Sequence, residues 1–99
     1  MDINKTQDGD KIIFSLSGRL DTISAPKLQE ALMPELDSAK QVLLDFAGIA
    51  YVSSAGLRVL LMGEKTAKAK GARQTFRNVS ADVMEVFEMT GFSDILNIE

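Results

Sequence analysis

Residues 51–59 read Tyr-Val-Ser-Ser-Ala-Gly-Leu-Arg-Val and join an apolar strand to a helix. The first turn of a helix leaves backbone N–H groups without partners and carries the positive end of the helix dipole. A serine at this junction therefore either caps the helix or offers its hydroxyl to an anion such as phosphate. The roles of Ser53 and Ser54 decide what this chain does.

This junction contains more than a helix cap requires. Ser53 is predicted to be the cap, and Ser54 then adds a second hydroxyl. Gly56, in the first helical turn, costs about 1 kcal/mol of helix propensity relative to alanine. We interpret Gly56 as giving another backbone room to approach Ser54.

Composition excludes most catalytic chemistry. The chain has 99 residues, of which 45% are hydrophobic, and this suits one domain, residues 1–99, with one core. Cysteine and histidine are absent, so the sequence has no disulfide, no thiolate metal ligand and no imidazole base. We expect a protein that is not an enzyme, with no catalytic residue, metal site or cofactor.

Charge and targeting signals favour a protein partner. The net charge is −3, and the excess of acidic residues lies in residues 1–50. The basic side chains of residues 65–77 are interpreted as a solvated face, so nucleic acid is not an expected partner. A signal peptide and a long apolar run are both lacking, and this predicts a cytoplasmic protein without membrane contact.

The first half of the chain predicts a hairpin followed by a helix. Residues 2–7 and 10–17 have strand character around a turn at residues 8–10, and residues 18–23 break the pattern. Ser24 is expected to cap a helix that holds Pro26 in its first turn. Pro34 is expected to kink this helix or end it early, which leaves residues 35–40 as a frayed connector.

The second half alternates strands and helices. Residues 41–46 form an apolar run typical of a strand buried on both faces. A helix is predicted from Ser53 to Lys70 with Gly71 as its stop, followed by a strand over residues 72–79. Ser80 is predicted to cap a third helix, which Gly91 ends, and residues 94–98 are predicted to form an edge strand.

The predicted order is β-β-α-β-α-β-α-β. It defines an α/β domain with a mixed sheet, because strands joined by a hairpin pair antiparallel and strands joined by helices pair parallel. Ligands of such sheets bind outside the carboxyl ends of the parallel strands. Residues 51–54 are expected at that edge.

Over its whole length the chain resembles the STAS domains, and specifically the anti-sigma factor antagonists of bacterial partner-switching systems. The most specific parts of this resemblance are residues 18–21 with Ala25 and Leu28, and residues 42–46, 49–58 and 87–92. In that family the first hydroxyl of an Asp-Ser-Ser/Thr-Gly-Leu motif is phosphorylated, and alignment on Gly56 and Leu57 places the acceptor at Ser54. Ser53 stands where many members have aspartate, and it remains a competing acceptor.

The resemblance implies a phosphorylation switch. The unphosphorylated chain would bind an anti-sigma factor that is also a serine protein kinase with an ATP-binding domain, and would thereby free a sigma factor. Phosphorylation at Ser54 would end this binding, and a PP2C-type phosphatase would restore it. The alternative is a STAS module that binds a small ligand or nucleotide at the same helix start in a sensor complex.

A set of residues near Ser54 is expected to contact the partner. Arg58, four residues after Ser54, could pair with a phosphate or with a partner's carboxylate. Tyr51 and Met62 could equally be core packing, and Asp21 could simply close a turn. Besides Ser54, the expected partner-binding residues are Asp21, Thr22 and Ile23 on the preceding loop, Ser53 and Gly56 at the helix start, and Tyr51, Arg58 and Met62 on the second helix.

Overall fold

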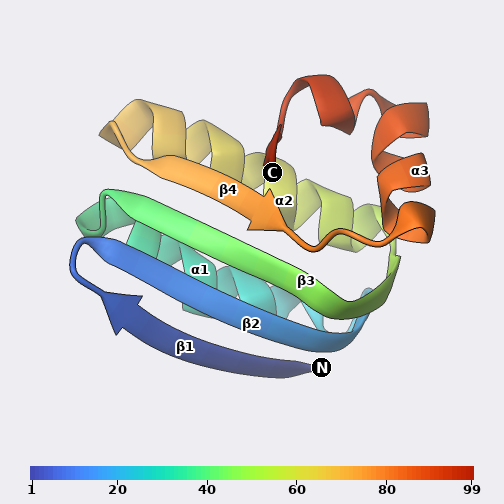
Figure 1. Ribbon diagram of the computed structural model, residues 1–99, viewed down its shortest axis with the longest axis horizontal. Coiled ribbons are helices and arrows are strands. Elements are labelled where there is room, and N and C mark those ends of the chain that lie inside the picture. Colours follow the sequence, from blue (N-terminus) through green and yellow to red (C-terminus); the bar gives the residue numbers. More distant parts are fainter.

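A β-hairpin begins the computed structural model, which describes residues 1–99 (Figure 1). Strands β1 (Asp2–Asp8) and β2 (Lys11–Leu20) pair antiparallel from Asp2↔Ser17 to Asp8↔Lys11. Gly9 adopts a φ of 62° in the turn, a conformation that glycine reaches without steric cost. The predicted hairpin is confirmed, but the break expected at residue 18 is wrong. β2 continues to Leu20 because its other edge pairs with β3.

The five strands form one mixed sheet in the order β1-β2-β3-β4-β5. β3 (Gln41–Val52), β4 (Arg73–Arg77) and β5 (Asn97–Ile98) are parallel to β2, whereas β1 is antiparallel to it. Helices α1 (Ala25–Ser38) and α2 (Ser54–Lys70) lie side by side on one face of the sheet, and α3 (Ala81–Thr90) lies beyond the end of β4 (Figure 1). The predicted element order and fold class are confirmed.

β3 is twice as long as expected. The sequence predicted a strand over residues 41–46, but pairing with β2 continues to Leu20↔Val52. The register shifts between Ser15 and Ser17 of β2 and again after Gly18, so β3 holds extra residues at each irregularity. These bulges disrupt the simple alternation on which strand prediction depends.

The core lies between the sheet and the two helices. Every second residue from Ile12 to Leu16 in β2 and from Val42 to Phe46 in β3 is buried in it, together with the apolar stripes of α1 and α2. Phe46, Phe76 and Phe87 meet with ring centroids 5.5 to 6.3 Å apart and join β3, β4 and α3. These contacts hold α3 against the end of the sheet.

α1 is continuous through Pro34. Pro34 is exposed on the helix, and the fully buried Leu32 and Leu36 lie on either side of it in the sequence. The early end of this helix and the frayed connector over residues 35–40 were therefore wrong predictions. Burial of the apolar stripe outweighs the backbone hydrogen bond that proline cannot donate.

The remaining helix ends follow local signals. Ser80 Oγ accepts the Val83 N–H at 3.2 Å, and Gly71 and Gly91 end their helices in the left-handed conformation, all as predicted. The edge strand predicted over residues 94–98 is mostly wrong, because a short 3₁₀ helix (Phe92–Asp94) precedes a β5 of two residues. No helix in the chain is long and apolar enough to cross a membrane.

One carboxyl group is buried between α2 and β4. Glu64 is 3% exposed, and its Oε1 lacks a hydrogen-bond partner, as does Oε1 of the fully buried Gln74. The Gln74 amide donates to the Leu60 carbonyl at 3.2 Å, and Lys68 lies 4.0 Å from the other Glu64 oxygen. Burial raises the pKa of Glu64 despite this lysine.

Replacing Glu64 with glutamine is expected to stabilise the protein at neutral pH. The folded protein holds the Glu64 proton more tightly than the unfolded chain does, so this carboxyl group favours folding at pH below its ordinary pKa. That contribution is lost as the pH rises through the raised pKa. Urea unfolding from about pH 4 to about pH 8 should give Glu64→Gln an advantage of about 1 kcal/mol at the alkaline end. The exposed Glu88→Gln is the control, and a Glu64→Gln protein less stable than wild type at pH 8 would contradict the assignment.

Candidate functional site

The last residues of β2 and β3 pair with each other and position the start of α2. Leu20 pairs with Val52 at the last position of the two strands, and the Ser53 N–H donates to the Leu20 carbonyl at 2.8 Å. The loop after β2 and the first turn of α2 are therefore neighbours at the carboxyl edge of the sheet (Figure 1). The position expected for residues 51–54 is confirmed.

The two adjacent serines have different environments. Ser53 is in an extended conformation, and its Oγ accepts the Gly56 N–H at 3.3 Å, so it is the helix cap that the sequence predicted. Ser54 is the first residue of α2 and is exposed, and its hydroxyl makes no hydrogen bond within the protein. Ser54 is the hydroxyl of the pair that is free to react or bind.

Asp21 closes the loop that faces this helix start. Its Oδ1 accepts the backbone N–H groups of Ser24 at 3.0 Å and Ile23 at 3.1 Å. The hydrogen bond from the Ser24 N–H is the main reason that the pKa of Asp21 lies below its usual value, and Ile23 and Arg19 add to the effect. The loop thus presents Ile23, which is 79% exposed, on a hydrogen-bonded turn.

Ser24 does not cap α1 through its side chain, so that prediction was wrong. Its backbone is already helical, and its hydroxyl donates to the Arg19 carbonyl at 2.6 Å. The same oxygen accepts the Asp21 N–H at 2.9 Å. The hydroxyl serves the loop between β2 and α1 instead of the helix end.

Sequence reasoning missed Arg19 and misplaced Tyr51. Tyr51 lies in β3, not on the second helix, and it pairs with Arg19 of β2 across the second bulge. The Arg19 guanidinium lies 4.1 Å from the centre of the Tyr51 ring, and its Nε lies 3.8 Å from Asp21. Only the bulged register brings these residues together, and the sequence carries no local signal for it.

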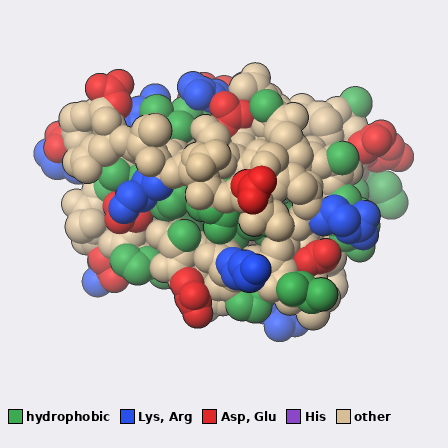
Figure 2. All heavy atoms as spheres, turned by 90° about the horizontal axis from the view of Figure 1, so that it is seen from below, with side chains coloured by type: hydrophobic (Ala, Val, Ile, Leu, Met, Phe, Trp, Pro, Cys, Tyr) green, Lys and Arg blue, Asp and Glu red, His purple; other side chains and the backbone are tan.

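We call the residues at this edge the Ser54 surface; all of them are exposed except Asp21, which is half-buried. Ser54, Arg58 and Met62 follow at intervals of four along α2 and are all exposed, so they share one helix face. Arg58 forms no ion pair. Hydrophobic and charged side chains are mixed at the right-hand end of Figure 2, the end at which β3 meets α2 in Figure 1. The Ser54 surface consists of Asp21, Thr22, Ile23, Tyr51, Ser54, Arg58 and Met62.

Gly56 is buried beneath this surface and serves the fold. A Cβ atom on Gly56 would lie 2.6 Å from Leu20 Cγ and 3.0 Å from the Leu20 carbonyl oxygen. The room left by the missing side chain is therefore taken by the protein's own Leu20. The interpretation that Gly56 gives another backbone access to Ser54 was wrong, because the open side of this residue faces inward.

The site has no features of a metal or cofactor pocket. The fold brings together no group of three or more Asp, Glu, His or Cys residues able to hold a metal ion. The two cavities of the protein are lined by residues at the other end of the sheet, among them Gln41 and Asp10, and do not include Ser53 or Ser54. The arrangement offers an exposed hydroxyl on a mixed apolar and charged surface.

The chain is an α/β domain with two helices on one face of a mixed sheet and a serine-capped helix start at the sheet's carboxyl edge. Residues 3–97 match the family model described as Mlab, STAS domain. The chain belongs to the STAS domain family.

Its relatives include named regulators. The chain is 28% identical over 98 residues to an anti-sigma-B factor antagonist of Bacillus subtilis, covering 99% of this chain and 90% of that protein. It is 31% identical over 98 residues to the anti-sigma-B factor antagonist of Listeria monocytogenes, covering 96% and 84%.

Solved structures share the fold. The unphosphorylated anti-sigma factor antagonist SpoIIAA superimposes with a TM-score of 0.84 at 16% identity, covering 99% of this chain and 88% of that one. The phosphorylated form of Bacillus SpoIIAA superimposes with a TM-score of 0.78 at 15% identity, covering 99% and 91%.

Replacing Gly56 with alanine is expected to destabilise the protein. Helix propensity alone would favour alanine by about 1 kcal/mol. The new methyl group would instead collide with the fully buried Leu20, at a cost of about 1 to 3 kcal/mol. Thermal or urea unfolding measures the sign. A Gly56→Ala protein more stable than wild type would contradict the packing role.

Replacement of each serine with alanine should change the free energy of unfolding by different amounts. Ser53→Ala removes the acceptor of the Gly56 N–H and should lower the free energy of unfolding by about 1 kcal/mol. Ser54→Ala removes a hydroxyl without a partner and should change it by less than about 0.5 kcal/mol. Urea unfolding of both variants compares them directly. The assignment fails if Ser54→Ala is the more damaging change.

Proposed function

We propose that this protein is an anti-sigma factor antagonist switched by phosphorylation. In its unphosphorylated form it binds an anti-sigma factor that is also a serine protein kinase with an ATP-binding domain, and so frees a sigma factor. Phosphorylation of Ser54 ends the binding. The observation that carries the proposal is the division between Ser53, whose hydroxyl caps α2, and Ser54, whose hydroxyl is exposed and free. The relatives that are anti-sigma-B factor antagonists indicate the class of partner, an anti-sigma factor.

A phosphate on Ser54 is compatible with the fold. It adds a charge of about −1.5 to −2 at the positive end of α2, where the dipole favours an anion by about 0.3 to 1 kcal/mol. Arg58 lies one helical turn later on the same face and forms no ion pair that would have to break. The modified serine and Arg58 can therefore pair within the protein.

The same phosphate would be costly inside an interface. A charge that leaves water without a partner carries a large desolvation penalty. A loss of only about 3 kcal/mol weakens binding by about two orders of magnitude. Pairing with the phosphate would also withdraw Arg58 from a carboxylate of the partner. Phosphorylation of Ser54 would thus disrupt the contact of the Ser54 side chain with the partner and also the ion pair of Arg58 with a partner carboxylate.

The Ser54 surface has the composition of a docking surface. Ile23, Tyr51 and Met62 are exposed by 79%, 41% and 37%, and they provide apolar area around the free hydroxyl. Binding energy in interfaces concentrates in such apolar and aromatic anchors with polar groups at their rim. Because the loop that bears Ile23 is held by Asp21, little ordering of the chain should be needed on binding.

A PP2C-type phosphatase would remove the phosphate, and the whole cycle would run in the cytoplasm without direct contact to nucleic acid or membrane. The protein acts in this scheme as the substrate of phosphoryl transfer and not as its catalyst. A small ligand or nucleotide at the start of α2 is less well supported, since neither cavity of the protein includes that position.

Binding to the kinase should separate Ser54→Ala from Ser54→Asp. The unmodified protein, used as bait in an extract of the source bacterium, recovers the anti-sigma kinase, whose affinity is then measured by calorimetry. Ser54→Ala should bind like wild type, and Ser54→Asp should bind about 10- to 100-fold more weakly because of the added charge. With ATP, wild type should gain one phosphate, mapped to Ser54 by mass spectrometry.

Two results would contradict the proposal. One is equal affinity of the alanine and aspartate variants, and the other is a phosphate mapped to Ser53. Ser53→Ala is the matched control, since it alters the neighbouring hydroxyl and should still accept phosphate at Ser54.

A further inference from the structure

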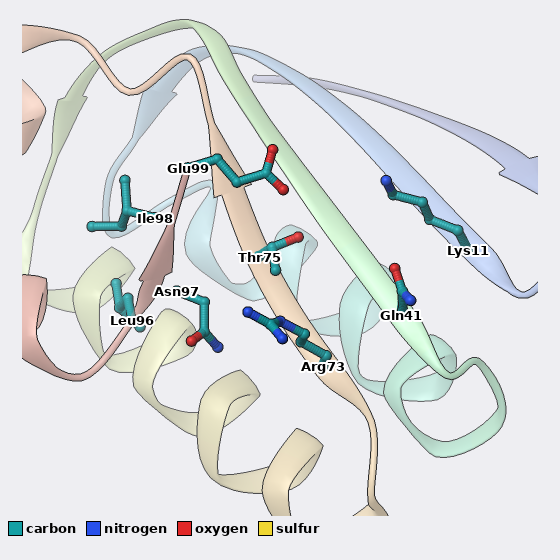
Figure 3. A pocket seen from close by; sticks show the side chains of 8 residues that line it. All are labelled: Lys11, Gln41, Arg73, Thr75, Leu96, Asn97, Ile98 and Glu99. Atoms are coloured by element: carbon teal, nitrogen blue, oxygen red, sulfur yellow. The ribbon is translucent and has the colours of Figure 1, made fainter.

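A second candidate site lies at the amino ends of the parallel strands, away from Ser54. A cavity of about 480 Å³ opens there, between the first residues of β2, β3 and β4 and the C-terminal segment (Figure 3). β3 runs from Gln41 at this cavity to Val52 beside Ser53, so the two sites lie at opposite ends of the same strand. The volume is in the range of pockets that hold small molecules.

The strand register aligns two cations across this cavity. Lys11 pairs with Gln41, and Gln41 pairs with Arg73, so the three residues form one row across the sheet. Paired residues in neighbouring strands project from the same face, and the strands are about 4.8 Å apart. The backbones of Lys11 and Arg73 are thus about 10 Å apart, within reach of one shared anion by their long side chains.

Neither cation forms an ion pair within the protein. No carboxylate oxygen lies within 4.0 Å of the Lys11 ammonium or the Arg73 guanidinium, although five other ion pairs occur. The other polar groups in the wall include hydrogen-bond donors from Gln41, Thr75 and Asn97. Asn97 uses its amide to donate to the Gln74 carbonyl at 3.2 Å, which fixes its position and leaves a second N–H available.

One acidic side chain stands in this cavity. Glu99 reaches from the C-terminal segment over β4, above Thr75 (Figure 3). It forms no ion pair with Lys11 or Arg73. Its charge would repel an anion bound below it. Removal of the Glu99 charge should therefore raise the affinity for an anion, whereas removal of a cation should lower it.

We propose that this cavity binds a small phosphorylated molecule, with a phosphoryl group held between Lys11 and Arg73. A guanidinium binds two phosphate oxygens side by side, and a lysine ammonium supplies a second point charge. Leu96 and Ile98 form the apolar part of the wall, on which a carbon skeleton can rest. This site is independent of the function proposed for Ser54, since the two share no residue.

A titration with pyrophosphate, followed by two-dimensional NMR of the ¹⁵N-labelled full chain, tests the site residue by residue. Saturable shifts should appear at Lys11, Gln41, Arg73 and Asn97, and not at residues 53–58. Arg73→Gln should weaken binding about tenfold, Glu99→Gln should strengthen it several-fold, and Ser54→Ala should leave it unchanged. Glycerol 3-phosphate serves as a second probe that also carries carbon atoms for Leu96 and Ile98.

Three outcomes would overturn the proposal. They are an absence of saturable shifts, shifts confined to the start of α2, and equal affinity of wild type, Arg73→Gln and Glu99→Gln, which would mean that the anion does not sit between the named groups. Both substituted residues are exposed, and a well-dispersed spectrum of each variant shows that its fold is intact.

Discussion

The structure depends most on the contacts of Leu20, at the end of β2. Its fully buried side chain packs against the open face of Gly56, its carbonyl accepts the Ser53 N–H at 2.8 Å, and its backbone pairs with Val52. These contacts join the end of the second strand to the first turn of the second helix. Without them the loop that holds Ile23 and the exposed Ser54 would not be held at one edge of the sheet.

The Ser54 surface illustrates how a structural hydroxyl can leave a neighbouring one available. Because Ser53 satisfies the Gly56 N–H, the Ser54 hydroxyl is not needed to cap the helix. Asp21 has a comparable structural role on the loop, where its carboxylate is used by backbone N–H groups. The caps and turns at this edge thus use the Ser53 and Asp21 side chains and leave the Ser54 hydroxyl without a partner.

Much of the fold could be predicted, because the signals involved are local. The hairpin around Gly9, the caps at Ser53 and Ser80 and the stops at Gly71 and Gly91 each depend on the conformational preference of one or a few residues. The failures have non-local causes. Pro34 stays helical because the leucines two residues before and after it are buried in the core. In the C-terminal segment, Phe92 packs on the core within a short 3₁₀ helix, where a strand was expected nearby.

By itself, the sequence determined the order of the elements, the class of the sheet and the presence of two hydroxyls at a helix start, since hydrophobic periodicity and capping act over a few residues. Only the tertiary structure decided that Tyr51 belongs to β3 and stacks with Arg19, that Gly56 makes room for Leu20, and that Lys11 and Arg73 flank one cavity. Each of these depends on strand register, which is set by pairing between residues distant in the chain and is altered here by two bulges.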